Sequence, residues 1–317
     1  MRVAVTGAAG FIGGETVLKL IDRGHEVLAI DRNPLPSHLL PWFGFGCNHF
    51  EQTDLASDQC LDALDQWEAQ CVIHCGGISL VGPSMSHPRL YYQDNFVKTK
   101  TLVDGLVARK VRMIFSSSAA VYGEPVITPC SEFDPVLPMS PYGQSKAMIE
   151  WMLDSYAKAY GLNYVSFRYF NACGADSQTR HGQEPDATHL VARLLESLRH
   201  DRVFQLNGDS YPTLDGTCVR DYVHVEDIAA AHVMAMEDQS CKGVYNLGTG
   251  QGHSNKQVID AVQRVLGHNL KIQLAQPRPG DPAQLTADAA KFSKATGWQP
   301  QYDLDAIIKH AWLWYTR

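Results

Sequence analysis

The sequence predicts an α/β fold, a doubly wound parallel sheet followed by a smaller C-terminal α/β domain. Three observations support this prediction. Apolar runs with the length of strands alternate with helical stretches from Arg2 to Phe170, which is typical of a parallel sheet covered by helices. A glycine-rich turn joins the first apolar run to the first helix. From residue 175 to 187 the sequence is polar and rich in Gly, Asp and Gln, which indicates a loop between two domains.

The expected domain boundary lies near residue 172. We expect residues 1–172 to form the first domain, joined by a returning segment near 220–247, and residues 173–317 to form the second. In the second domain helical patterns cover 190–198 and 257–266. A chain of 317 residues, 45% of them hydrophobic, is long enough for two domains with substantial cores.

Charge and composition exclude several classes of protein. The net charge is −7, and Lys and Arg are scattered rather than gathered in a basic run, so no nucleic-acid partner is expected. No apolar stretch approaches the roughly 20 residues of a spanning helix, and the N-terminus has no signal-peptide pattern, so we expect a cytoplasmic protein with no membrane partner. The eight cysteines form no C-x-x-C pair, and no metal site is expected.

The first strand and turn predict a dinucleotide site. Residues 3–5 form an apolar strand, and Thr6-Gly7-Ala8-Ala9-Gly10-Phe11-Ile12-Gly13 leads into a helix that continues to Ile21. Glycines allow the backbone to turn tightly and to approach a pyrophosphate, and the free N–H groups at the start of the helix bind that anion. This strand, turn and helix predict a Rossmann-type sheet.

The second strand favours NAD as the dinucleotide. It covers residues 26–30 and ends on Asp31, roughly 20 residues after the glycine turn, where a carboxylate binds the adenosine ribose hydroxyls. Asp31 would repel the 2′-phosphate of NADP, although Arg32 beside it leaves some tolerance for NADP. The alternative is that Asp31 is an ordinary residue at the end of a strand.

Further strands and helices complete the first domain. Strands are expected over 71–77, 111–115 and 164–170, and helices over 91–106 and from Pro141 onward. The run Cys71-Val72-Ile73-His74-Cys75 contains three potential metal ligands. In a strand these residues alternate between the two faces, so metal binding there is not expected.

The stretch from Ser116 to Lys146 contains the candidate catalytic residues. Pro141 favours the first position of a helix, so Tyr142 and Lys146, four residues apart, project from one face. An ammonium group beside a phenol lowers the phenol's pKa from about 10, which makes the phenol a usable general acid or base. Ser118, at the carboxyl end of an apolar strand, can lie between this base and a substrate. The alternative is an ordinary side-chain pair on a surface helix.

The sequence resembles the extended short-chain dehydrogenase/reductase family and, within it, the UDP-glucose 4-epimerases, over nearly its whole length. The Tyr142 and Lys146 pair is shared by the superfamily, and the run from Tyr211 to Tyr222 is far more specific to the epimerases. The motifs that carry the resemblance are the glycine turn, Val72-Ile73-His74, Ser116 to Gly123, Tyr142 with Lys146, Arg168-Tyr169-Phe170-Asn171, Tyr211-Pro212-Thr213, Asp215-Gly216-Thr217, Val219 to Val225, Tyr245-Asn246-Leu247-Gly248 and Arg278-Pro279-Gly280-Asp281.

The resemblance implies an NAD-dependent isomerase that interconverts UDP-galactose and UDP-glucose. In such enzymes NAD removes a hydride from C4 of the hexose and the tyrosine accepts the hydroxyl proton. The resulting 4-keto sugar turns over, and the hydride returns to its other face. Ser118, Tyr142 and Lys146 are then the catalytic residues, and Lys146 also holds the nicotinamide ribose. Open alternatives are a 4-epimerase of UDP-N-acetylhexosamines or UDP-pentoses, and a nucleotide-binding sensor or scaffold without activity.

Related sugar-nucleotide dehydratases and decarboxylases are disfavoured. They require an additional carboxylate just after the catalytic serine or threonine, and this chain has Ala119 and Ala120 there. A methyl group can neither donate nor accept a proton, so the 4-keto sugar can only be reduced again.

The resemblance also assigns binding residues. Those expected at NAD are Gly7, Gly10, Phe11, Ile12, Gly13, Asp31, Asn33, Asp54, Leu55, Cys75, Gly76, Gly77, Asn95, Tyr142, Lys146 and Phe170. Those expected at the UDP-sugar are Ser118, Tyr142, Asn171, His189, Leu190, Gln205, Asn207, Arg220, Arg278, Asp281 and Leu285. Arginine suits the pyrophosphate because a guanidinium group binds phosphate oxygens in pairs.

Three further positions affect how the cofactor and the substrate are expected to bind. Ser79 stands where well-known relatives have a lysine near the cofactor, and Asn207 stands where some place an aromatic side chain against uracil. Leu285 falls where relatives gate the space beside the C2 substituent, and a leucine there favours UDP-glucose and UDP-galactose over N-acetylated sugars.

The family also implies a homodimer, in which the helix of Tyr142 and the helix over 91–106 pack against their symmetry mates.

Overall fold

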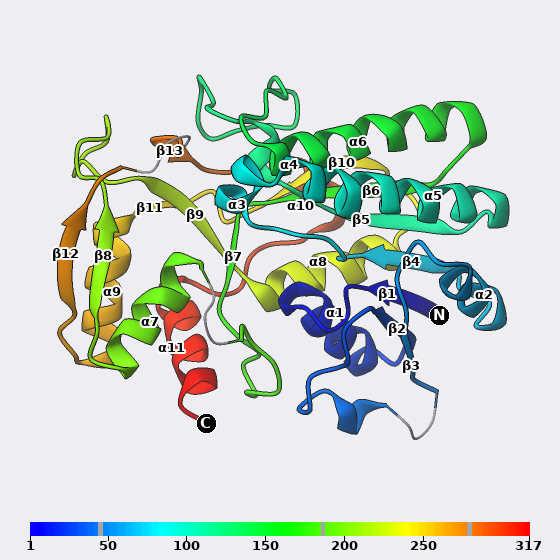
Figure 1. Cartoon of the computed structure of the whole chain (residues 1–317), viewed down its shortest axis with the longest axis horizontal. Coiled ribbons are helices and arrows are strands. Elements are labelled where there is room, and N and C mark those ends of the chain that lie inside the picture. Colours follow the sequence, from blue (N-terminus) through cyan, green and yellow to red (C-terminus); the bar gives the residue numbers. More distant parts are fainter. Residues whose placement is uncertain (44–46, 185–187, 278–280) are drawn as a thin grey trace.

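In the computed structural model, which describes residues 1–43, 47–184, 188–277 and 281–317, the larger lobe is built on a seven-stranded parallel sheet (Figure 1). The strand order is β10-β6-β5-β4-β1-β2-β3. The chain order reverses between β1 and β4, and ligands of such sheets bind outside the carboxyl ends of the strands at that reversal. The predicted doubly wound sheet is confirmed. Its strands are β1 (Arg2–Thr6), β2 (Glu26–Asp31), β3 (His49–Gln52), β4 (Cys71–His74), β5 (Arg112–Ser118), β6 (Tyr164–Tyr169) and β10 (Gly243–Leu247).

Helices cover both faces of this sheet. Helices α1 (Phe11–Asp22) and α8 (Val225–Glu237) pack on one face, and α2 (Asp58–Gln66), α5 (Lys98–Arg109) and α6 (Pro141–Tyr160) pack on the other. The alternation of side chains along β1 explains this division. Val3 and Val5 lie in the apolar cluster under α1 and α8, whereas Ala4 lies in the cluster under α2, α5 and α6.

The helix expected over 91–106 is longer and less regular than the sequence predicts. It consists of α4 (Pro88–Tyr91), a π-helical segment η2 (Tyr92–Val97) and α5, and α3 (Val81–Ser86) precedes it. Single π-helical turns inside α-helices are frequent at functional sites. The hydrophobic spacing of this stretch does not distinguish a π-helical turn from an α-helical one.

The helix that carries Tyr142 begins as predicted. Pro141 is its first residue, and the Oγ atom of Ser140 accepts a hydrogen bond from the N–H of Gly143 at 3.1 Å. The helix ends at Gly161, which adopts a left-handed conformation with φ 73°. Local capping therefore sets both ends of α6.

The smaller lobe has its own apolar core, at the left of Figure 1. The predicted helices over 190–198 and 257–266 are confirmed as α7 (Leu190–Arg199) and α9 (Asn255–Leu266). Between β9 and β11 the chain returns to the larger lobe, where β10 pairs with β6 and α8 packs beside α1. The remaining elements are η1 (Leu40–Trp42), η3 (Ala119–Val121), β7 (Asn171–Cys173), β8 (Val203–Asn207), β9 (Val219–His224), β11 (Gly252–Ser254), β12 (Lys271–Ala275), β13 (Gln284–Leu285), α10 (Ala290–Thr296) and α11 (Leu304–Tyr315).

Among the described residues no helix combines the length and the apolar character that crossing a bilayer requires.

Candidate functional site

The glycine turn between β1 and α1 is as tight as the sequence predicts. Gly7 has a φ of 74°, and a Cβ atom there would lie 2.5 Å from the backbone nitrogen of Gly76. A Cβ atom on Gly13 would lie 2.0 Å from the carbonyl oxygen of Gly7. Gly10 occupies the N-cap position of α1 and has no side chain that could bond the first N–H groups of the helix. The turn can therefore receive an anion close to the backbone.

A cavity of about 290 Å³ opens at the carboxyl ends of β1, β2 and β4. Nine residues predicted to bind the dinucleotide line it: Gly7, Gly10, Asp31, Asn33, Asp54, Leu55, Cys75, Gly76 and Gly77. Seven other predicted residues are not among its lining: Phe11, Ile12, Gly13, Asn95, Tyr142, Lys146 and Phe170. The cavity wall also contains Arg32, which the sequence connected with tolerance for NADP, and residues that it did not single out for binding: Ala9, Ile30, Pro34, Thr53, Asp94 and Lys98.

Asp31 is oriented by two backbone groups. Its Oδ2 atom accepts from the N–H of Ala9 at 3.1 Å, and its Oδ1 atom accepts from the N–H of Asn33 at 2.9 Å. These bonds hold the carboxylate at the end of β2, in the cavity wall. The glycine cradle and this carboxylate fit the pyrophosphate and the adenosine ribose of NAD.

Asn95 positions the cavity wall rather than lining it. Its Oδ1 atom accepts from the N–H of Ile78 at 2.8 Å, and its Nδ2 atom donates to the carbonyl oxygen of Ile78 and to the Oγ atom of Ser145, both at 3.0 Å. The π-helical segment thus ties the loop after β4 to the first turns of α6. Ser79, in the same loop, is exposed.

Ser118, Tyr142 and Lys146 lie together at the carboxyl edge of the sheet. Ser118 ends β5, and it lies close enough to the phenol of Tyr142 to favour the ionised form of that phenol. Lys146 lies one turn further along α6, and its Nζ atom donates to the carbonyl oxygen of Ser116 at 2.8 Å. The predicted grouping of the three side chains is therefore present.

The prediction that Lys146 lowers the pKa of the Tyr142 phenol is wrong for the protein without bound ligands. Burial raises the pKa of Tyr142, and the interaction with Ser118 offsets only part of this shift. Burial also lowers the pKa of Lys146 to about 8. The Nζ atom of Lys146 lies 6.0 Å from the centre of the Tyr142 ring and is bonded to the backbone of β5. Spacing along the helix predicted the shared face but not the desolvation of both groups.

A buried polar network lies behind this triad. Glu150, one turn beyond Lys146, accepts from the hydroxyl of Ser117 at 2.5 Å and from the Nη2 atom of Arg168 at 2.6 Å. Arg168 also donates to the Tyr122 hydroxyl at 2.9 Å. These bonds join α6 to β5 and β6 directly beneath the candidate catalytic residues. The sequence pointed to Arg168 through its motif and gave no signal for Glu150.

The predicted substrate residues lie on the smaller lobe and at its junction with the larger one. Arg220 on β9 lies opposite Leu285 of β13, and its Nη2 atom is 3.6 Å from the Oδ1 atom of Asp281. Asn171 begins β7, which pairs with β9. His189 is the N-cap of α7 and directly precedes Leu190. Gln205 and Asn207 lie on β8. Arg278 falls outside the described residues.

Leu285 lies near the candidate catalytic serine. Its side chain is 8% exposed and belongs to the same apolar cluster as Ala119 and Phe170. Ala119 follows Ser118 directly. The predicted gate residue therefore belongs to the apolar cluster that includes the residue directly after Ser118.

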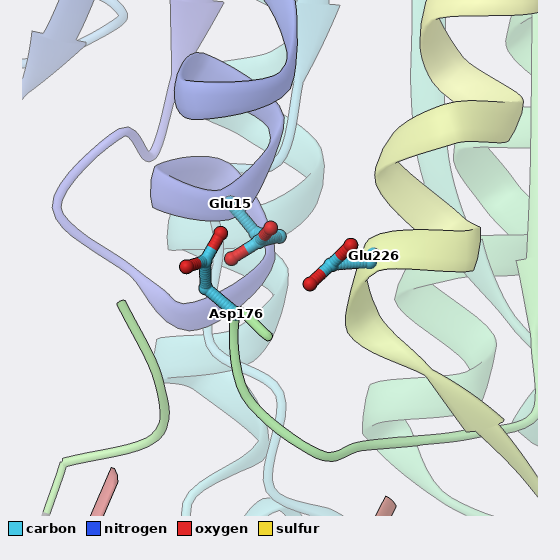
Figure 2. Close-up of side chains that lie close together, drawn as sticks. All are labelled: Glu15, Asp176 and Glu226. Atoms are coloured by element: carbon cyan, nitrogen blue, oxygen red, sulfur yellow. The ribbon is translucent and has the colours of Figure 1, made fainter. Parts of the chain in front are cut away.

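Three carboxylates that the sequence did not connect come together between the lobes. Glu15 of α1, Asp176 of the loop after β7 and Glu226 of α8 point toward one another (Figure 2), and their oxygens lie within 4.8 Å. Asp176 accepts from Arg180, and Glu226 accepts from Tyr302.

Glu15 is the least compensated member of this group. One of its oxygens has no hydrogen-bond partner among the described residues. Burial raises the pKa of Glu15 well above its ordinary value, and the charges of Asp176 and Glu226 add to this effect. Glu15 therefore keeps its proton to a higher pH than an exposed carboxyl does.

Replacing Glu15 by Gln is expected to stabilise the protein at alkaline pH and to change little near pH 4. A carboxyl whose pKa is raised by folding contributes stability that is complete below its unfolded pKa and is lost as pH rises through the folded one. Each unit of that difference costs about 1.4 kcal/mol. Thermal unfolding of wild type and Glu15→Gln as a function of pH measures the effect, with Glu26→Gln, on an exposed residue, as the control. Equal pH dependence in all three proteins would contradict it.

The fold and the site define a class of protein. A doubly wound sheet with a dinucleotide cavity, and a serine, a tyrosine and a lysine at its carboxyl edge, are typical of NAD-dependent enzymes of the short-chain dehydrogenase/reductase type. A model of the NAD dependent epimerase/dehydratase family matches residues 3–248. The chain belongs to this family.

Individual relatives have a more particular name. The chain is 40% identical over 323 residues to the UDP-glucose 4-epimerase of Halalkalibacterium halodurans, with 99% of this chain and 96% of that protein covered. The crystal structure of UDP-glucose 4-epimerase from Brucella ovis in complex with NAD is similar with a TM-score of 0.92 at 36% identity, covering 98% of this chain and 97% of that one. The Stenotrophomonas maltophila UDP-glucose 4-epimerase, with bound NAD and formylated UDP-arabinopyranose, gives a TM-score of 0.94 at 32% identity, covering 100% and 98%. The resemblance inferred from the sequence is confirmed.

Proposed function

We propose that this chain is an NAD-dependent UDP-glucose 4-epimerase, an isomerase that interconverts UDP-galactose and UDP-glucose through a 4-keto sugar. The observation that carries the proposal is the grouping of Ser118, Tyr142 and Lys146 at the carboxyl edge of the sheet, where Tyr142 and Lys146 are buried on one face of α6 and Lys146 is bonded to the backbone of β5. Full-length similarity to UDP-glucose 4-epimerases supports the same activity.

The chain's own residues supply proton transfer and positioning. NAD bound in the cavity would supply the hydride acceptor for C4 of the sugar and the donor for its return. Tyr142 takes the proton of the C4 hydroxyl, and Ser118, which lies close to the phenol, orients the same sugar oxygen. Lys146, anchored on the carbonyl oxygen of Ser116, holds the nicotinamide ribose. Because hydride and proton return to the same atoms, no redox partner is consumed.

The residues beside the catalytic serine limit the chemistry to epimerisation. Ala119 and Ala120 form the short helix η3 directly after Ser118, and Ala119 is buried. Elimination or loss of carbon dioxide from a 4-keto sugar requires a further acid or base near the reaction centre. Methyl groups cannot serve in that role, so the intermediate is reduced again.

The two lobes divide the binding of cofactor and substrate. Residues 1–172, with the returning α8 and β10, hold the dinucleotide, since the glycine turn, Asp31 and the triad all lie there. Residues 173–317 hold the UDP-sugar. Arg220 and Arg278 bind its pyrophosphate and Asp281 its uridine ribose, while Gln205 and Asn207 of β8 contact the uracil.

The protein is expected to carry NAD as purified and to reach equilibrium between UDP-galactose and UDP-glucose with no net release of NADH. Absorbance at the NADH band during turnover, together with chromatography of both sugars, tests this expectation. Stoichiometric NADH accumulation would show a dehydrogenase instead, and sugar nucleotides returned unchanged would show a binding protein.

Replacing Leu285 by Ser is expected to raise kcat/KM for UDP-N-acetylgalactosamine relative to UDP-galactose by about tenfold, because a shorter side chain leaves room beside C2. The wild type should prefer UDP-galactose, since Leu285 is a buried, bulky side chain in the same apolar cluster as Ala119 and Phe170. The two kcat/KM values are compared as a ratio within each variant, so a smaller fraction of folded protein does not affect the result. Leu285→Ile, which keeps the volume, is the control. A wild type that prefers the N-acetylated sugar would remove Leu285 from this role.

A homodimer is the proposed assembly state. Apolar side chains are exposed along α3, α4, η2 and α6, which pack beside one another near the top of Figure 1: Met85, Leu90, Val97 and Trp151. Exposed apolar residues gathered on neighbouring helices are typical of an interface, and a two-fold axis lets one surface bury itself against its copy. Light scattering at micromolar concentration should show a dimer, and Trp151→Glu should reduce it to a monomer.

A further inference from the structure

A chain of ion pairs crosses the dinucleotide cavity wall. The Nη1 atom of Arg32, which follows β2, lies 2.8 Å from the Oδ2 atom of Asp94 in the π-helical segment. The Nζ atom of Lys98 lies 3.1 Å from the Oδ1 atom of Asp94 and 2.6 Å from the Oδ2 atom of Asp54. All four side chains belong to residues that line the cavity. The pairs therefore join the loops after β2 and β3 to the helix that follows β4.

This arrangement bears on which dinucleotide the cavity accepts. NAD and NADP differ by a phosphate on the adenosine ribose, the sugar that a carboxylate after β2 recognises. Asp31 is held in the cavity wall by the N–H groups of Ala9 and Asn33, so a phosphate there would meet a negative charge. Only a nearby cation can offset that repulsion.

Arg32 is the nearest candidate along the chain, and Asp94 engages it. Arg32 follows Asp31 directly and lines the same cavity. Its side chain is about half exposed (52%), whereas that of Asp94 is 11% exposed and is bonded to two cations. The less exposed partner sets the position of the more exposed one, because departure of the guanidinium would leave a largely covered carboxylate with one cation fewer.

We propose that Asp94 is a specificity-determining residue that makes the protein select NAD over NADP, by engaging the Arg32 guanidinium in an ion pair so that this cation is not free to bind a 2′-phosphate. Asp31 excludes the phosphate directly, and Asp94 removes the cation that would compensate. The inference rests on the dinucleotide site of the proposed function and does not depend on which sugar is turned over.

The test is a competition between the two dinucleotides. Wild type and Asp94→Asn are equilibrated with an equimolar excess of NAD and NADP, separated from free nucleotide and denatured, and the released dinucleotides are quantified. The amide keeps the size of Asp94 and removes its charge. The ratio of bound NADP to bound NAD is expected to rise by about tenfold or more, which corresponds to about 1.4 kcal/mol.

Two controls separate specificity from a structural role. Asp104→Asn removes a carboxylate from the same helix outside the cavity lining, where Asp104 pairs with Lys100, and should leave the ratio unchanged. The double variant Asp94→Asn with Arg32→Gln should lose the gain, because the released guanidinium is what binds the phosphate. If Asp94→Asn weakens both dinucleotides equally, or if the gain persists without Arg32, the proposal is overturned. A protein without epimerase activity whose ratio of bound NADP to bound NAD still changes would support the proposal. Failure of this proposal is therefore distinguishable from failure of the proposed activity.

Discussion

Replacing Tyr142 by Phe is expected to reduce kcat for epimerisation by about 10²–10⁴-fold while fold and bound NAD are retained. The change removes one oxygen atom, the phenol oxygen whose pKa Ser118 lowers. The ring keeps its place because it is 8% exposed and packs edge-on against Tyr91, with ring centres 6.4 Å apart. Turnover of UDP-galactose measures the loss, and the nucleotide content of the purified variant shows that the cavity is intact.

Tyr91→Phe is the matched control for that experiment. It removes the same atom from a neighbouring, fully buried tyrosine that makes no proton transfer in the proposed mechanism. Its kcat should stay within a few-fold of wild type. If Tyr142→Phe kept activity comparable with Tyr91→Phe, the phenol would not be the acid–base group.

Replacing Arg168 by Met is expected to lower the free energy of unfolding by about 3–5 kcal/mol, because it leaves the Glu150 carboxylate buried without its cation. The two side chains are 5% and 3% exposed, and the Nη2 atom of Arg168 lies 2.6 Å from the Oε2 atom of Glu150. Chemical denaturation at one fixed NAD concentration measures the loss, since bound dinucleotide stabilises the folded state in every variant.

A double variant decides whether charge burial is the cause. Replacing Glu150 by Met in addition removes the uncompensated charge, so the pair of changes should cost less than Arg168→Met alone. Arg264→Met is the surface control, because the Arg264 and Asp305 pair has the same 2.6 Å separation with side chains 62% and 43% exposed. It should change stability little. A double variant less stable than both single variants would point to lost packing instead.

The consequence for activity follows from where Glu150 lies. Tyr142, Lys146 and Glu150 succeed one another at single turns of α6, and Glu150 binds Ser117, the residue before Ser118. The network therefore sets how the tyrosine faces the serine. In Glu150→Gln protein that folds, we expect kcat to fall by a larger factor than KM changes. The reason is that positioning acts on the reacting atoms and not on the nucleotide half of the substrate.

The sequence by itself determined the features that depend on local chain geometry. Gly7 and Gly13 form a turn that no side chain would fit, and Ser140 and Pro141 begin a helix that places Tyr142 and Lys146 on one face. The alternation of apolar runs with helical stretches from Arg2 to Phe170 predicted a parallel sheet covered by helices. These predictions succeeded because backbone conformation, capping and periodicity are set by residues close together in the chain.

Only the tertiary structure decided the environment of the charged groups. Arg32 meets Asp94 and Arg168 meets Glu150 across separations of 62 and 18 residues, and no spacing rule connects such partners. Burial raises the pKa of Tyr142, where the sequence predicted that Lys146 would lower it. The physical reason is that desolvation and ion pairing depend on what surrounds a side chain in space, and that surrounding comes from several distant segments packed together.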